Sequence, residues 1–142
     1  MRRTVNLMCA MVLSIGLGLA LHVERAAAQE WEVIAGGEID YRNYCAACHG
    51  VDARGQGPMG KFLTVRPADL TQLAKNNGGI FPFWQTYRII EGREDVRGHG
   101  TREMPVWGDR FRAQAGGADI GSRAQAAGRL LSVVFYLQHI QE

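Results

Sequence analysis

Apolar residues recur along this chain at intervals of three and four, which is the spacing of amphipathic helices. The clearest stripe lies near the C-terminus and consists of Leu130, Val133, Val134 and Leu137. Its helix is predicted to begin near Asp119 or Ser122 and to end near Ile140. Ser122 with Gln125 resembles a capping box, in which the two side chains satisfy backbone N–H groups at a helix start.

A first helix is predicted to begin between Trp31 and Gly37 and to run into Cys45. Gly37, Tyr41 and Cys45 are spaced by four, so they share one helix face. A glycine on such a face lets another backbone approach closely.

Shorter helices are predicted between these two. Asp69 is a suitable N-cap for one that ends at Asn76 to Gly79. Pro82 to Glu91 forms another, because proline suits a first turn and Gly92 follows the last residue. Glu94 to Gly108 is expected to be mostly loop. No strand signal of useful length is present, so the predicted fold class is all-α.

The N-terminus has the pattern of a cleaved secretory signal. Two arginines precede an apolar run from Leu7 to Val23, and an A-x-A sequence ends at Ala28. We expect residues 1–28 to be a signal peptide and residues 29–142 to form one domain. The alternative is an uncleaved membrane anchor, although the run is close to the lower limit for spanning a bilayer.

Charge excludes one class of partner. Removing residues 1–28 takes away three of the 16 basic and one of the 14 acidic residues, which leaves a formal net charge of zero. A nucleic-acid binder needs a basic surplus, so none is expected. The removed segment also contains Cys9, which leaves two cysteines.

Those two cysteines form the run Cys45 to His49, which reads C-x-x-C-H and is typical of c-type haem attachment. Residues three apart in a helix lie on one side, so both thiols can reach one edge of a porphyrin. The adjacent imidazole can then bind the iron. Its other N–H is expected to donate to the carbonyl of Gly57 or Pro58.

Two other interpretations of the motif are weaker. A redox dithiol does not require the histidine, and no βαβ pattern surrounds the pair. A closed zinc site needs four ligands, and no second cysteine pair exists.

The second axial ligand decides between an electron carrier and an enzyme. The candidates are Met59, His99, Met104 and His139. We favour Met104, because Pro105 has a fixed φ and holds the loop shape, with His99 as the alternative. Thioether ligation favours ferrous iron and raises the reduction potential, and two protein ligands close the iron to substrates. Trp84, Tyr87 and Ile90 are candidates to line the haem pocket, with ordinary core packing as the alternative and as the favoured interpretation for Ile90.

These residues resemble class I c-type cytochromes. The matches are Gly37, Tyr41, Cys45 to His49, Pro58, Met104-Pro105, Val133 and Tyr136-Leu137. The resemblance covers most of residues 30–142 and implies a cytochrome c-like fold around one covalent haem c. It also implies that Gly37 and Tyr41 pack against Val133 and Tyr136.

Three further stretches are similar to bacterial periplasmic single-haem members, namely Arg66 to Thr71, Ile89 to Arg93 and Met104 to Gly108. The resemblance implies a periplasmic protein that is not an enzyme and that carries one electron between respiratory or dehydrogenase partners. Those partners include a dehydrogenase, a cytochrome bc complex, or a terminal oxidase or reductase. Membrane association is then expected only through partners, unless the leader is retained.

Two departures from the family concern the surface. Ala115 to Gly121 is unusually long and glycine-rich, and Lys61 and Lys75 are the only lysines, so a lysine docking ring is missing. Arg102, Arg110 and Arg112 flank the methionine loop and are candidates to replace it. A solvated surface of mixed charge is an equal alternative, because Glu103 and Asp109 lie among them.

Two alternative functions stay open at this point. The chain could be a haem subunit of a larger oxidoreductase, or a haem enzyme or gas sensor in which Met104 is labile. In the latter, His99 or Arg102 would act on a bound peroxide or gas.

Overall fold

A computed structural model of the chain describes residues 24–25, 28–94 and 104–142. The chain forms two compact units, residues 1–32 and 33–142. Most of the predicted signal peptide, including Cys9, lies outside the described residues. Within the described residues, no helix combines the length and apolar character that a membrane crossing requires.

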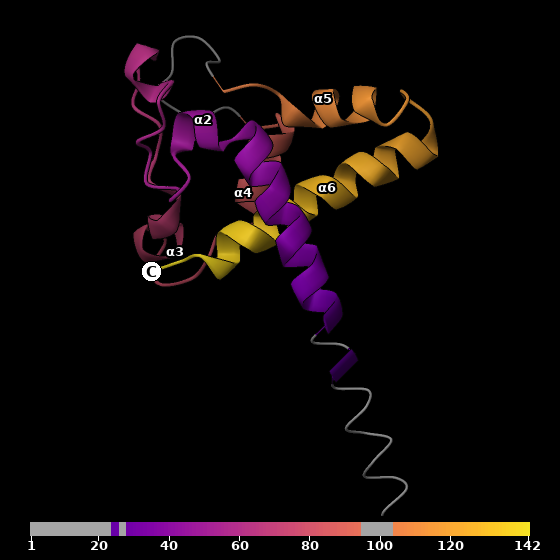
Figure 1. Cartoon of the computed structure of the whole chain (residues 1–142), viewed down its shortest axis with the longest axis horizontal. Coiled ribbons are helices and arrows are strands. Elements are labelled where there is room, and N and C mark those ends of the chain that lie inside the picture. Colours follow the sequence, from indigo (N-terminus) through magenta and orange to yellow (C-terminus); the bar gives the residue numbers. More distant parts are fainter. Residues whose placement is uncertain (1–23, 26–27, 95–103) are drawn as a thin grey trace, which may run out of the picture. The chain divides into compact units, whose positions relative to one another are not determined.

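The described part of the chain contains helices and no strand, which confirms the all-α prediction. The helices are residues 28–44, α2 (Ala46–His49), η1 (Gly60–Phe62), η2 (Leu70–Gln72), α3 (Leu73–Asn76), α4 (Phe83–Glu91), α5 (Trp107–Gln114) and α6 (Ile120–His139), as Figure 1 shows. The predicted start of the first helix was wrong, because the chain is already helical at residue 28. Ala28 to Ala35 favour helix, and two glycines after them do not interrupt it.

The helix 28–44 and α6 cross at Gly37. A Cβ built on Gly37 would lie 1.9 Å from the Ser132 carbonyl oxygen and 3.0 Å from the Tyr136 Cβ. One turn further on, Tyr41 is fully buried, and its ring lies 5.3 Å from that of Tyr136. The expected close backbone approach is therefore confirmed, and no other residue type fits at position 37 without a shift.

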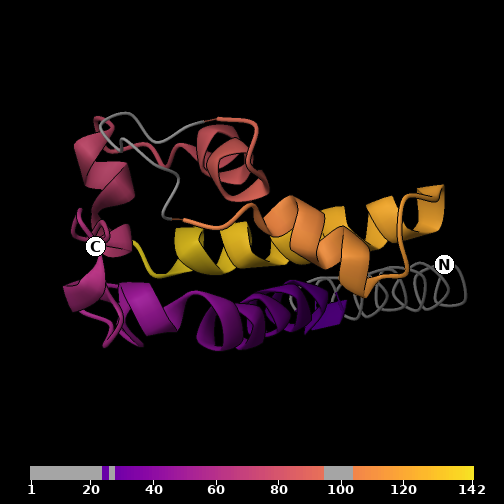
Figure 2. The same cartoon turned by 90° about the horizontal axis from the view of Figure 1, so that it is seen from above.

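The α6 helix supplies most of the core. Its predicted apolar stripe is at most 2% exposed and comprises Leu130, Val133, Val134 and Leu137. Helices α4 and α5 both pack against it, and α5 also contacts α4 (Figures 1 and 2). The α5 helix was not predicted, because its buried face consists of Trp107, Gly108 and Phe111 and so carries only two large apolar side chains.

Capping side chains define where the elements begin. Asp69 accepts a hydrogen bond from the Thr71 N–H at 2.9 Å, as predicted. Asp119 does the same for the Ser122 N–H at 3.1 Å, so Asp119 is the N-cap of α6. The capping-box assignment of Ser122 was wrong, because its hydroxyl donates to the Ala115 carbonyl instead.

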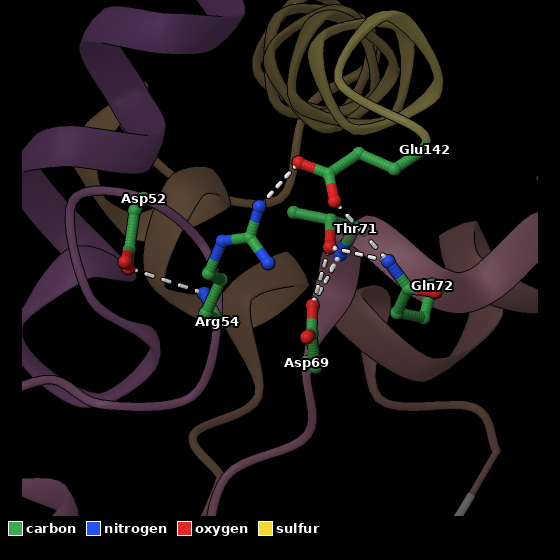
Figure 3. A network of polar contacts seen from close by, with 6 residues as sticks. All are labelled: Asp52, Arg54, Asp69, Thr71, Gln72 and Glu142. Atoms are coloured by element: carbon green, nitrogen blue, oxygen red, sulfur yellow. Dashed lines mark hydrogen bonds and ion pairs between the residues drawn. The ribbon is translucent and has the colours of Figure 1, made fainter.

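Polar contacts join the segment after α6 to two earlier segments (Figure 3). The Glu142 carboxylate pairs with the Arg54 guanidinium at 2.5 Å and accepts a bond from the Gln72 amide at 3.4 Å. The Glu142 backbone N–H donates to the Thr71 carbonyl at 3.0 Å. Because the ion pair is half-exposed, we expect the network to fix position more than to add stability.

The crossing at Gly37 generates a stability prediction with a control on the same helix. We expect Gly37→Ala to lower the free energy of unfolding by about 1–3 kcal/mol, because the methyl group meets backbone. Gly36→Ala places its methyl group in open space, so it should be neutral or stabilise by up to about 1 kcal/mol. Denaturant titration of the two variants measures both. Equal effects at the two positions would contradict the packing described here.

Candidate functional site

A cavity of about 600 Å³ lies between the helices and the loops that follow α2 and α4. It brings together the four residues singled out by the sequence, which are Cys45, Cys48, His49 and Met104. Most of the remaining wall is apolar and includes Leu63, Val65, Leu70, Ile89, Ile90, Val133 and Leu137. The volume falls in the range of about 300–1,000 Å³ typical of ligand and cofactor sites.

The cysteine pair sits on the tight turn that follows the first helix. The Cys45 N–H donates to the Tyr41 carbonyl at 2.8 Å, and the His49 N–H donates to the Cys45 carbonyl at 2.9 Å. Cys45 and Cys48 are half-buried, and neither is in a disulfide. Burial, followed by the nearby Asp40 and Cys48, raises the pKa of the Cys45 thiol to about 12. Cys45 is therefore a neutral thiol at physiological pH.

The His49 imidazole is held by a backbone carbonyl from a distant segment. Its Nδ1 lies 3.1 Å from the Ala68 carbonyl oxygen. Because a carbonyl only accepts, Nδ1 must carry the proton, and the neutral ring then has its lone pair on Nε2. Burial lowers the pKa of His49, more than the Ala68 hydrogen bond raises it, which favours this neutral form. A neutral imidazole with its proton on Nδ1 and its lone pair on Nε2 is a form that ligates metals.

The predicted carbonyl partners, Gly57 and Pro58, were wrong. The Gly57 N–H donates to the Cys48 carbonyl at 3.0 Å, and a Cβ on Gly57 would lie 2.5 Å from the Ala47 carbonyl oxygen. This loop therefore packs against the backbone of α2. The segment that lies against the imidazole is a later one, around Ala68.

Met104 reaches the cavity because the segments on either side of it are interlocked. A Cβ on Gly92 would lie 2.5 Å from the Val106 Cγ1, and one on Gly108 would lie 2.7 Å from the Glu91 carbonyl oxygen. The end of α4 and the start of α5 thus fit together through two glycines. Met104 lies just before this contact, half-buried against the core and in the cavity wall.

Other candidate residues lie elsewhere. Met59 is 48% exposed, and His139 is exposed at the end of α6. Trp84 is 63% exposed, so its predicted place in the pocket was wrong; Tyr87 is buried but does not line the cavity. The alternative ligand His99, together with Arg102, lies outside the described residues.

Several lining residues were missed by the sequence analysis. Thr86 and Ile89 come from the inner face of α4, where their i, i+3 spacing was the available signal. The Tyr44 and Trp107 rings are in tilted contact, with centroids 5.4 Å apart, and both line the cavity. Their pairing joins the first helix to α5, and nothing in the local sequence indicates it.

The donor set suits a soft or borderline metal, since it combines two thiols, an imidazole and a thioether. Among the described residues, no group of three or more His, Cys, Asp and Glu side chains is placed to hold an ion. The apolar wall and the volume suit a flat, largely apolar cofactor. Comparison with known families, curated proteins and solved structures finds no match for this chain.

The contact between the end of α4 and the start of α5 can be tested with two glycines of similar backbone conformation. Gly92 and Gly79 have φ values of +101° and +89°, so alanine is strained at both. Only Gly92 is crowded, by Val106. We expect Gly92→Ala to cost about 1–3 kcal/mol more unfolding free energy than Gly79→Ala, measured by denaturant titration. A smaller loss for Gly92→Ala would show that the segments are not interlocked.

Proposed function

We propose that this protein is a periplasmic electron-transfer protein of the class I cytochrome c type. Its cofactor would be one haem c, bound in the cavity between the helices. The observation that carries the proposal is the convergence of Cys45, Cys48, His49 and Met104 on one apolar cavity. The first three are adjacent in sequence, but Met104 arrives from a separate segment.

The two thiols would hold the cofactor covalently. Cys45 and Cys48 lie on one turn of backbone, so both sulfurs can meet one edge of a porphyrin. Each thiol would add across a vinyl group, with sulfur joining one carbon and hydrogen the other. No oxidant or reductant is needed for this step.

His49 and Met104 would hold the iron of that cofactor. The Ala68 carbonyl fixes the imidazole in the tautomer that has its lone pair on Nε2. The thioether of Met104 is the softer ligand and favours the reduced metal. A haem c held this way supplies one iron centre that gains or loses a single electron.

The rest of the site would keep the cavity dry and closed. With the cofactor in place, the largely apolar wall would limit the access of water and so the rearrangement around a changing charge. Two protein ligands leave no coordination position for a substrate, so we propose a carrier and not an enzyme. Partners would be redox proteins that dock briefly through small surfaces, such as a dehydrogenase, a cytochrome bc complex or a terminal oxidase.

The place of action follows from the chemistry of the N-terminus. We propose that residues 1–28 direct export and are removed, which leaves residues 29–142 as a monohaem domain in the periplasm. The intact mass of protein from cells that attach haem reports both the cleavage site and one covalent haem. A colourless product of those cells would refute the proposal.

Spectra separate the carrier from a haem enzyme or gas sensor. We expect the oxidised protein to show a weak long-wavelength absorption band from sulfur-to-iron charge transfer. We expect the spectrum of the reduced protein to stay unchanged when carbon monoxide is added. Ready carbon monoxide binding would favour the enzyme or sensor. Haem lost on acid-acetone extraction would mean that neither thiol is attached.

Substitution of the methionine tests the ligand assignment. We expect Met104→Ala to retain the haem, to lower the reduction potential by on the order of 0.1 V, and to allow carbon monoxide binding. Met59→Ala is the matched control, because that residue is half-exposed and does not line the cavity; it should change neither property. An unchanged potential in Met104→Ala would exclude Met104 as a ligand.

A further inference from the structure

An ion pair joins the first helix to α6 close to the cavity. The Arg129 Nε lies 2.9 Å from the Asp40 Oδ2, and its Nη2 lies 2.6 Å from the Asp40 Oδ1. This is a two-pronged pair, which fixes both the distance and the orientation of the guanidinium. A third bond, from the Arg129 Nη1 to the Gln114 Oε1 at 2.7 Å, ties it to α5.

Aromatic rings surround the same guanidinium. Its central carbon lies 3.9 Å from the Phe111 ring centroid and 5.4 Å from that of Tyr44. Tyr44 lines the cavity and contacts the Trp107 ring, which lines it as well. The guanidinium is therefore in contact with a ring that itself lines the cavity.

The pair is partly shielded from water. The Arg129 and Asp40 side chains are 26% and 14% exposed, whereas the Arg42 and Glu38 side chains on the same first helix are 55% and 40% exposed. Solvent screens the second pair more strongly than the first.

We infer that Asp40 and Arg129 form a charge-compensated pair that holds the reduction potential of the group bound in the cavity near its unbiased value, and that loss of either charge alone shifts this potential. The inference rests on the proposed function, because it requires a redox centre at that site. Asp40 favours the oxidised, more positive state, and Arg129 favours the reduced one. In the wild-type protein the two effects largely cancel, and the aromatic rings hold the charges in place.

The direction in which each substitution shifts the reduction potential follows from the charge that remains. Arg129→Gln leaves the Asp40 carboxylate unneutralised, so the reduction potential should fall. Asp40→Asn leaves the guanidinium unneutralised, so the potential should rise. In each case we expect the ratio of reduced to oxidised protein at a fixed ambient potential to change about two- to tenfold, which is the order of a unit-charge effect in a partly solvated protein.

The decisive measurement is a spectroelectrochemical titration of the haem-loaded full chain in these variants and in the double variant Asp40→Asn/Arg129→Gln. A charge effect predicts shifts of opposite sign in the single variants and a return towards wild type in the double variant. A packing effect predicts shifts of one sign that add in the double variant. The second pattern would overturn the inference.

Two further variants keep the test informative if one protein folds poorly. Arg129→Lys preserves the charge but loses the two-pronged geometry, so its potential should stay near wild type. Glu38→Gln removes a screened carboxylate from the same helix and should shift the potential less than Asp40→Asn. An equal shift for Glu38→Gln would contradict the inference. Haem-free protein would instead refute the proposed function, so the two failures are distinguishable.

Discussion

The structure depends first on the close approach of two backbones, where Gly37 meets Ser132. That contact lets the first helix cross α6 without a side chain between them. Tyr41 fills the space one turn later, with its hydroxyl donating to the Gly50 carbonyl at 2.6 Å. The turn that begins at Cys45 is therefore held in a fixed position relative to α6, whose inner face forms one wall of the cavity.

Another part of the cavity wall also depends on close approach at glycines. Glycines at positions 92 and 108 let the end of α4 and the start of α5 fit together, and Met104 lies just before that contact. In both places a missing side chain, not an added bond, permits the arrangement. Packing of this kind is rigid, because interiors are close-packed and cannot yield continuously. The imidazole and the thioether can thus be held on one cavity although they belong to separate segments.

Signals that act within one helical turn were readable from the sequence. Asp69 as a cap, the ends of α4 and the buried stripe of α6 depend on residues at most four apart, and all three predictions were confirmed. Features with a tertiary cause were not readable from the sequence. The Ala68 carbonyl lies 19 residues from His49, and α5 has too few apolar residues to stand out. The Asp40–Arg129 pair spans 89 positions and left no trace in the local pattern.

That pair also bears on why a charged group lies beside an apolar cavity. A single buried charge is costly, and a pair recovers that cost only when its geometry is good and its remaining hydrogen bonds are satisfied. Here the two-pronged contact, the Gln114 amide and the Phe111 ring meet those conditions. Under the proposed function, a neutral pair would orient α5 and the first helix without biasing the centre strongly towards either redox state. Under the proposed function, a substitution of either charged residue would then shift the reduction potential while the apolar residues of the cavity wall stay the same.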